Sequence, residues 1–390
     1  MFDPIKASKE IKDSYIDYIT TTFDMADTDY EREFRKELQT DGMVASGPFL
    51  DIGGSYETGH TLRELIQAQK ASVLFESLEP VAEKERELKL DRPLYQHQEA
   101  AMLKAGKGEN LVVTTGTGSG KTESFLLPII DHLLREQEAG TLSAGVRAII
   151  IYPMNALAND QMKRMRALFK NYPQICYGVY NGNTEHTQSK ALAEYHRTYH
   201  DETGEPTDPA PNEIISREVM QERPPHILIT NYSMLEYMML RPKDDAVFSG
   251  AKLKFIVLDE AHIYKGATGM ETSLLMRRLR ARISEPDSVQ YILTSATLGG
   301  PDADGDILSF AEKLCGVAFQ RSGIIRSTEK RPAMEDYLDF APALFEELQK
   351  SPDISSVLAR YHADFAPGGS EDEKLYALFL HSRLFALLRK

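Results

Sequence analysis

The stretch NLVVTTGTGSGKTES, residues 110–124, constrains what this chain can fold into more than any other segment. Its apolar start at Leu111, Val112 and Val113 predicts a buried strand, and residues 123–134 have the apolar period of a helix. A glycine-rich loop between a strand and a helix presents backbone N–H groups and the positive end of the helix dipole to one point. The stretch therefore predicts a phosphate-binding loop, and the competing interpretation is a plain glycine-rich turn.

The side chains of this loop predict how a nucleotide would be held. Lys121 is expected to reach the terminal phosphates, and the hydroxyl of Thr122 is expected to ligate Mg²⁺. Thr115 stands where such loops usually begin with glycine, and the spacing of the glycines differs from the dinucleotide pattern G-x-G-x-x-G. The other predicted cofactor contacts are the loop residues Thr117, Gly118, Ser119 and Gly120.

A second apolar run, residues 255–258, ends in acidic residues that complement the loop. Asp259 would hold Mg²⁺ through the water shell of the ion, and Glu260 could orient and deprotonate the water that attacks a terminal phosphate. Lys121, Asp259 and Glu260 are therefore the predicted catalytic residues. His262 either couples the nucleotide site to a neighbouring motif or is a hydrogen-bonded residue at the start of a helix. Taken alone, the run Asp-Glu-Ala-His could also be a solvated acidic turn.

The order of these motifs resembles the first motor domain of superfamily 2 helicases of the DExH type. LYQHQ, which ends at Gln98, is similar to the Q motif of the family, in which this glutamine would read the adenine edge. YPMNAL at residues 152–157 and TNYSML at residues 230–235 resemble motifs Ia and Ib. SAT at residues 295–297 resembles motif III. The resemblance extends over about residues 90–320, and the motifs are most similar to those of large bacterial helicases of the MrfA type.

The resemblance implies an α/β fold, a RecA-like P-loop NTPase domain with a mostly parallel sheet, and ATP and Mg²⁺ as its cofactors. It also implies that motifs Ia and Ib contact the backbone of a nucleic acid and that motif III couples the nucleotide site to strand separation. The residues at these motif positions are Pro153, Asn155, Thr230 and Asn231 for nucleic acid, and Ser295 and Thr297 for coupling. Gly182, in the stretch VYNGNT, is a further nucleic-acid candidate, although a plain turn is as strongly favoured there.

The favoured function is an ATP-dependent helicase or translocase that acts on DNA rather than RNA, in repair or phage defence. The alternatives are an ATP-gated docking module and a translocase subunit of a nuclease complex, neither with motor activity of its own. Nucleic acid is the main expected partner, together with repair or defence proteins. The formal net charge of −14 opposes bulk attraction to nucleic acid, so we expect the contacts to be confined to a local groove.

Three regions are expected along the chain: an acidic helical region over residues 1–90, an ATP-binding motor domain over 91–320, and a helical region over 321–390. The apolar period of the last helix continues to Leu387 and Leu388 without a cap. We therefore expect the second motor domain in cis, whose arginines complete the ATP site in the family, to lie beyond this chain.

Several weaker patterns complete the sequence-based expectations. An apolar stripe formed by Ile11, Tyr15, Tyr18 and Ile19 is expected to pack on the motor domain, and the proline- and charge-rich residues 194–211 are expected to be a mobile insertion. No apolar run approaches the length of a membrane span, and the two cysteines lie far apart. These features favour a cytoplasmic protein without a membrane partner.

Overall fold

The computed structural model describes residues 4–23, 25–40, 42–46, 56–78, 88–116, 118–200, 204–248, 251–296, 299, 301–330, 337–351 and 353–383. Contacts divide the chain into two compact units: Tyr56–Glu329 forms one, and Met1–Ser55 with Lys330–Lys390 forms the other. Within the described residues, no helix combines the length and the apolarity that a membrane span requires.

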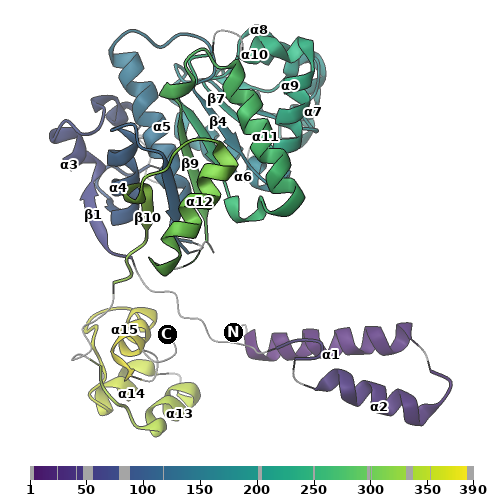
Figure 1. Ribbon diagram of the computed structural model, residues 1–390. Helices are drawn as coiled ribbons and strands as arrows, with labels where there is room; N and C mark the ends of the chain where they lie inside the picture. The colour runs from purple at the N-terminus through teal and green to yellow at the C-terminus, as the bar shows by residue number, and fades with distance from the viewer. Residues whose placement is uncertain are drawn as a thin grey trace. The chain divides into compact units, whose positions relative to one another are not determined.

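An eight-stranded parallel sheet is the centre of the unit Tyr56–Glu329 (Figure 1). Each strand pairs with its neighbours in parallel, so all the carboxyl ends meet at one edge of the sheet. The strands in spatial order are β10 (Ile324–Arg326), β3 (Leu111–Thr114), β9 (Gln290–Ser295), β8 (Phe255–Leu258), β4 (Ala148–Ile151), β7 (Ile227–Thr230), β5 (Tyr177–Tyr180) and β6 (Glu213–Ile214).

Helices cover both faces of this sheet, because successive side chains of each buried strand point to opposite sides. Leu111 and Val113 of β3 pack with one group of helices, whereas Val112 packs with the other group. The first group contains α3 (Leu62–Gln67), α4 (Gln96–Ala105), α5 (Lys121–Glu138) and α6 (Asn155–Phe169). The second group contains α8 (Arg217–Glu222), α9 (Tyr232–Leu240), α10 (Asp245–Phe248), α11 (Gly266–Arg282) and α12 (Asp304–Cys315). The predicted α/β fold with a mostly parallel sheet is thereby confirmed.

A short antiparallel pair precedes the phosphate loop in the chain. β1 (Thr58–Thr61) pairs with β2 (Pro93–Tyr95), and α4 follows β2 directly. The backbone N–H of Glu57 also donates to the carbonyl of Thr328, 2.8 Å away. Residues from both ends of the unit Tyr56–Glu329 therefore meet beside the sheet.

The helical segments of the other unit are α1 (Pro4–Thr22) and α2 (Thr28–Gln39), and α13 (Pro342–Lys350), α14 (Ile354–Arg360) and α15 (Glu371–His381). On α1, Ile11, Tyr15 and Tyr18 are exposed and Ile16 is buried. Packing of the apolar stripe on the motor domain stays a prediction. A small apolar cluster that includes Leu344, Leu358 and Leu378 holds the last three helices together.

The last helix also ends earlier than its apolar period indicates. α15 stops at His381, and Ser382 adopts an extended conformation and forms a bridge with Leu338. Leu387 and Leu388 lie outside the described residues.

Residues 194–211 differ from the predicted mobile insertion in their described part. Residues 194–198 complete α7 (Gln188–Thr198), and Tyr195 is buried. Tyr199 accepts a backbone hydrogen bond from Thr207, and His196 approaches Asp208 to 2.6 Å. The segment thus folds back on itself before β6.

Candidate nucleotide and nucleic-acid site

The predicted phosphate loop joins the carboxyl end of β3 to the first residue of α5. Gly118 and Gly120 have φ angles of 74° and 72°, in the left-handed region that glycine adopts without a side-chain clash. α5 begins at Lys121, so its unpaired N–H groups face the loop. Ser119 is fully buried, and its hydroxyl donates to that of Thr115 at 2.7 Å. Thr117 lies outside the described residues.

The Q-motif residue Gln98 holds the loop in place. Its side-chain oxygen accepts from the backbone N–H of Tyr95 at 2.9 Å, and its nitrogen donates to the carbonyl of Gly120 at 3.1 Å. A Cβ added at Gly120 would lie 2.3 Å from that nitrogen, so only glycine allows this approach. His97 contacts the carbonyl of Ser119 from the same helix at 2.8 Å. Adenine recognition by Gln98 stays a prediction.

Lys121 and Glu260 meet across the sheet edge. The Lys121 Nζ lies 2.9 Å from Glu260 Oε1, and the side chains are only 11% and 25% exposed. The pair forms because β9 alone separates β3 from β8, which brings the loop and the acidic residues together. Thr122, the next residue of α5, is partly exposed. A cation and a carboxylate from segments far apart in the sequence are thus joined where a phosphate chain would approach.

Asp259 and Glu260 differ in environment although they are adjacent. Burial raises the pKa of Asp259 above its ordinary value, an effect that the hydrogen bond from Thr294 partly offsets. The Thr294 hydroxyl donates to Asp259 Oδ1 and accepts from the backbone N–H of Glu260. Glu260 has φ 48° and ψ 49°, a left-handed conformation that costs energy for any residue other than glycine. Two strand ends therefore hold this acidic turn in a strained form.

Thr294 is a contact that the sequence motif did not single out. The register of β8 and β9 pairs Leu258 with Leu293, so the next residues along, Asp259 and Thr294, lie side by side. The only sequence signal is that Thr294 directly precedes Ser295. Because its hydroxyl touches both acidic residues, Thr294 links the end of β9 to the acidic turn more directly than the predicted residues do.

The predicted coupling residue Ser295 contacts the nucleotide side of the edge. Its hydroxyl lies 3.1 Å from His262 Nδ1, and the same nitrogen lies 3.3 Å from Glu260 Oε2. The carbonyl of Ser295 accepts from the N–H of Thr115 at 3.1 Å. Ser295 and His262 thus connect the acidic turn to the base of the loop. Thr297 is not among the described residues.

The amide side chains of motifs Ia and Ib meet at the next part of the edge. Asn231 Nδ2 donates to Asn155 Oδ1 at 2.8 Å, and Asn231 Oδ1 caps α9 by accepting from the N–H of Met234. Pro153 and Asn155 are partly exposed at the start of α6. Thr230 differs from these, because it is buried and its hydroxyl donates to the carbonyl of Tyr180. Its side chain therefore supports the sheet edge from within.

Gly182 lies in the exposed turn that follows β5. A Cβ at this position would meet no atom within 4 Å, so the turn leaves open space above it. Below the turn, the buried guanidinium of Arg217 donates to the carbonyl of Asn181 at 2.9 Å and lies 5.2 Å from the ring centroid of Tyr180. Arg217 was not predicted, and its place in the middle of a polar stretch gives no motif that could have revealed it.

Tyr56 is a further residue that the sequence analysis missed. Its hydroxyl lies 3.0 Å from the position that a Cβ on Gly116 would take, so the phenol reaches the phosphate loop. Its ring packs edge-on against Tyr95 and His97, with centroid distances of 5.5 and 5.8 Å. This aromatic cluster therefore borders the phosphate loop. Tyr56 belongs to no motif, so the sequence alone carries no signal for it.

The donor set fits a polyphosphate with a divalent cation. N–H groups, glycines and Lys121 face one side, and the carboxylates of Asp259 and Glu260 face the other. Oxygen ligands such as the Thr122 hydroxyl and the Asp259 carboxylate are those that Mg²⁺ prefers. The amide-bearing helix starts lie beside this set on the same sheet edge.

Comparisons with known proteins agree with this geometry. The family model described as DEAD/DEAH box helicase matches residues 95–304, more than half of the chain. Druantia protein DruE of Escherichia coli (strain UMEA 4076-1) is 34% identical over an aligned length of 414 residues, gaps included. The alignment covers 83% of this chain and 22% of that protein. The chain therefore spans less than a quarter of the length of this relative.

A solved structure gives the same fold. DEAD-box helicase Mss116 bound to ssRNA and UDP-BeF superposes with a TM-score of 0.51 at 16% identity, covering 80% of this chain and 55% of that chain. The DUF1998 helicase MrfA bound to DNA gives a TM-score of 0.48 at 23% identity, covering 70% of this chain and 29% of that chain. The predicted superfamily is confirmed, and the chain belongs to the DEAD/DEAH box helicase family.

Proposed function

We propose that this chain carries the ATP-binding motor part of a nucleic-acid helicase or translocase. The observation that supports this most strongly is the shared sheet edge. The loops after β3, β9 and β8 bring Lys121 and Glu260 into contact, and the loops after β4 and β7 bring Asn155 and Asn231 into contact. Because both proposed sites lie on the same sheet edge, a movement at the nucleotide site can be transmitted to the strand-binding site.

ATP with Mg²⁺ is the proposed cofactor, and a bound Mg²⁺ would neutralise charge that develops on the phosphate oxygens. Lys121 would leave Glu260 and contact the terminal phosphates, while Thr122 and Asp259 would hold the metal. Glu260, freed from Lys121, would accept a proton from the attacking water. Gly118, Ser119 and Gly120 would offer backbone N–H groups to the phosphates.

Coupling between the two sites is proposed to pass through the end of β9. Thr294 contacts both Asp259 and Glu260, and Ser295 contacts His262. A change in the position of Glu260 on nucleotide binding would therefore shift Thr294 and Ser295, at the end of β9. Ser295 and His262 are proposed as the relay.

The nucleic-acid contacts are proposed to be largely independent of sequence at the strand backbone. Pro153, Asn155 and Asn231 lie at or near helix starts, where N–H groups and amides suit phosphate oxygens. Gly182 lies in the exposed turn after β5. The net charge of −14 limits the number of phosphates that the chain can neutralise. Affinity should therefore fall with salt, but with a modest slope.

The proposal is tested by measuring the binding of ATP·Mg²⁺ by calorimetry and of single-stranded DNA by fluorescence anisotropy. We expect Lys121→Ala to weaken ATP binding at least about tenfold, because a charge-assisted contact to phosphate is lost. Lys107→Ala, which removes an exposed lysine remote from the loop, is the matched control. Equal ATP affinity in the wild type and Lys121→Ala would refute the nucleotide assignment, and salt-independent DNA binding would refute the groove.

A further inference from the structure

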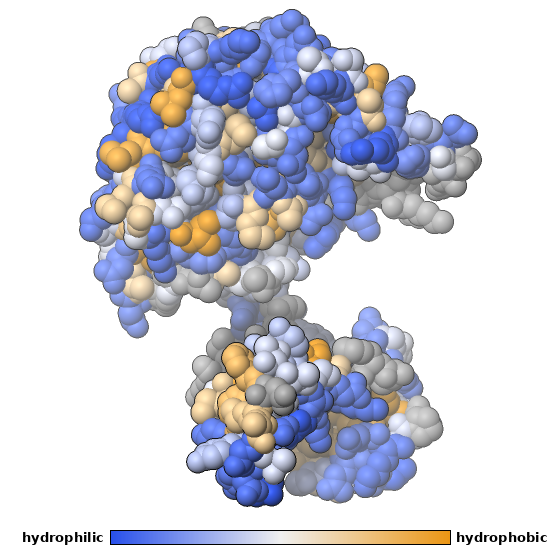
Figure 2. Space-filling view, turned by 90° about the vertical axis from the view of Figure 1, so that its right-hand side faces the viewer, coloured by the Kyte–Doolittle hydropathy of each residue, from blue (hydrophilic) through white to orange (hydrophobic). Residues whose placement is uncertain are grey.

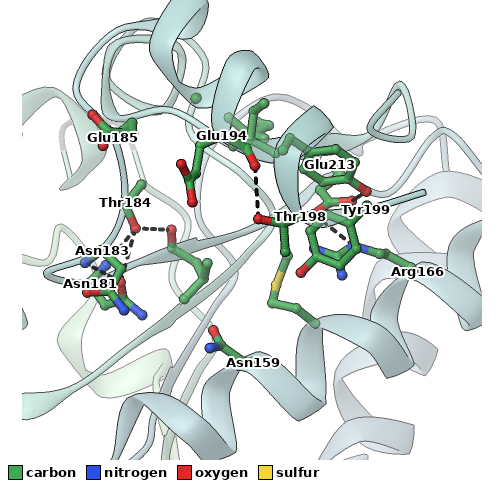
Figure 3. Close-up of a pocket in the computed structure, with 16 residues that line it drawn as sticks. Asn159, Arg166, Asn181, Asn183, Thr184, Glu185, Glu194, Thr198, Tyr199 and Glu213 are labelled. Atoms are coloured by element: carbon green, nitrogen blue, oxygen red, sulfur yellow. Dashed lines mark hydrogen bonds and ion pairs between the residues drawn. The ribbon is translucent and has the colours of Figure 1, made fainter. Parts of the chain in front are cut away.

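A pocket of about 170 Å³ opens between α6, α7, β6 and the turn after β5 (Figure 3). Its floor and walls are mainly apolar, with Met162 from α6, Val179 from β5 and Ile214 from β6 among the lining residues. None of the nucleotide contacts discussed above lines it. It is therefore separate from the phosphate loop and its acidic partner.

One wall of the pocket is held rigid by a neutralised guanidinium. Arg166 donates to both carboxylate oxygens of Glu213, at 2.7 and 2.8 Å, and Glu213 is almost fully buried. The same guanidinium lies 4.3 Å from the ring centroid of Tyr199 and 5.4 Å from that of Tyr195. The wall thus presents flat aromatic and guanidinium surfaces while its positive charge is already paired. Such a wall suits a planar ring better than a phosphate.

Hydrogen-bonding groups surround the opening of the pocket. In Figure 3, Asn159 projects from α6 on one side, Glu194 lies on the opposite side, and Asn183 borders the turn after β5. Glu185 also lines the pocket, so two carboxylates and several side-chain amides lie around it. Carboxylates only accept hydrogen bonds when ionised. The rim therefore favours a ligand that donates.

The pocket adjoins the proposed path of the nucleic acid on two sides. Asn159 lies one helical turn after Asn155, on the same face of α6. Asn181 and Asn183 line the pocket and flank Gly182 in the chain. A strand whose backbone contacts Asn155 and Gly182 would therefore pass across the mouth of the pocket.

We propose that the pocket receives one unstacked nucleobase of the bound strand and favours cytosine over thymine or uracil. This inference rests on the proposed nucleic-acid binding. Single-stranded nucleic acids are commonly held by stacking of splayed bases on aromatic and arginine planes. The pocket volume of about 170 Å³ leaves room for one base.

The exocyclic groups of the pyrimidines explain the preference. Cytosine presents an N4 amino donor, whereas thymine and uracil present an O4 acceptor at the same position. Glu194 and Glu185 can accept from the amino group but would repel the oxygen. Asn159, which both donates and accepts, can pair with the remaining edge of the ring.

The test compares single strands of about 12 nucleotides made only of dC or only of dT, and the same pair as RNA, in anisotropy titrations with the full chain. We expect the wild type to bind dC about five- to tenfold more tightly than dT, since one good base contact changes affinity by about that factor. The RNA pair shows whether the base is taken from DNA or RNA, because the base chemistry is shared.

Three variants locate the source of the preference. Asn159→Ala and Glu194→Gln should reduce the ratio of dC to dT affinity to within about twofold. Asp160→Ala is the control: it lies next to Asn159 on α6, pairs with Lys163 and does not line the pocket. It should alter both affinities alike and keep the ratio. Thermal melting verifies that each variant is folded.

The outcomes separate the two proposals. Tight, salt-dependent binding with equal affinity for dC and dT would overturn the pocket assignment and leave the proposed function intact. A preference for dC that persists in Asn159→Ala and Glu194→Gln would also overturn it. Absence of binding to every strand would overturn the proposed nucleic-acid function and the pocket assignment together.

Discussion

The two halves of the sheet edge have the same backbone construction and opposite side-chain chemistry. After β3, β9 and β8 the edge carries charged residues in direct contact, with Lys121 against Glu260. After β4, β7 and β5 it carries amides and hydroxyls, with Asn155 against Asn231. Phosphoryl transfer requires charge and a proton acceptor, whereas amides and hydroxyls can form hydrogen bonds to the phosphates and sugars of a nucleic acid. The comparison teaches that the side chains at the strand ends, and not the sheet itself, set the chemistry of each half.

Removing the charge of Glu260 tests this contrast most strongly. We expect Glu260→Gln to keep or raise the affinity for ATP, because Lys121 no longer has a competing carboxylate partner. Hydrolysis should fall by about 10² to 10⁴, the usual contribution of a general base. The measurements are ATP binding by calorimetry and phosphate release under single-turnover conditions.

Glu236→Gln is a suitable control, since Glu236 pairs with Arg278 away from the nucleotide site. A loss of ATP affinity in Glu260→Gln, with hydrolysis otherwise unchanged, would assign Glu260 to binding. The edge after β3, β9 and β8 would then bind its ligand without supplying a general base, as the edge after β4, β7 and β5 is expected to do.

Truncating the amide pair tests the other half with a smaller effect. We expect Asn155→Ala to weaken single-stranded DNA binding about threefold to tenfold without altering ATP affinity, because one hydrogen-bonding contact to the strand is lost. Asn231→Ala should do the same and should also cost about 1 kcal/mol of stability, since Asn231 caps α9. Anisotropy titrations and urea unfolding measure the two effects.

The double variant sharpens the comparison. If the two amides act as one unit, the combined loss of affinity should be smaller than the sum of the single losses. A change in ATP affinity in either single variant would show that the neutral half also supports the nucleotide.

The smallest expected effect is a pH dependence of stability, which arises from His226, outside both halves of the sheet edge. Burial lowers the pKa of His226, and the positive charge of Arg147 lowers it further. Its Nδ1 accepts from the N–H of Cys176 at 3.0 Å, a bond that protonation would break. Between the lowered pKa and about 6.5, the unfolded chain binds more protons than the folded chain, so stability falls with falling pH. The loss is at most about 1.4 kcal/mol per pH unit for this group.

His226→Asn should flatten that slope in urea unfolding between about pH 7 and pH 5, because asparagine can accept from Cys176 without titrating. Some slope remains, since burial also lowers the pKa of His97 and of His132. His186→Asn, at an exposed position, is the control. An unchanged slope in His226→Asn would show that protonation of this residue does not limit stability.

The sequence predicted the sheet well because its strands are buried on both faces. The apolar runs at residues 111–113 and 255–258 match β3 and β8 to within one residue. Such runs are readable since a parallel sheet covered by helices needs apolar residues on both sides of each strand. Lys121 and Glu260 were predicted as site residues for the same reason: each follows a strong strand signal or its loop. Their direct contact was not predicted.

The remaining features depend on contacts between distant segments. Thr294 matters because the register of two strands brings it beside Asp259, and Tyr56 matters because a short antiparallel pair brings it to the loop. Neither the Thr294 contact nor the Tyr56 contact can be predicted from the residues next to it in the sequence. On α1, the helical period singled out Ile11, Tyr15, Tyr18 and Ile19 but not Ile16, which is buried. Residues 194–211 were read from their prolines and charges, whereas Tyr195 and Tyr199 decide their packing.

The order of strands in the sheet has a consequence for synthesis on the ribosome. β3 and β4 follow each other in the chain, yet β9 and β8 lie between them in space. A nascent chain that ends before residue 255 therefore holds the inner edges of β3 and β4 without their partner strands, and unpaired edges are templates for aggregation. The ribosome must add 139 residues after Lys121 before Glu260 is present. The Lys121–Glu260 pair thus forms late, after most of this chain has been made, and folding is slowed by the distant contacts on which it depends.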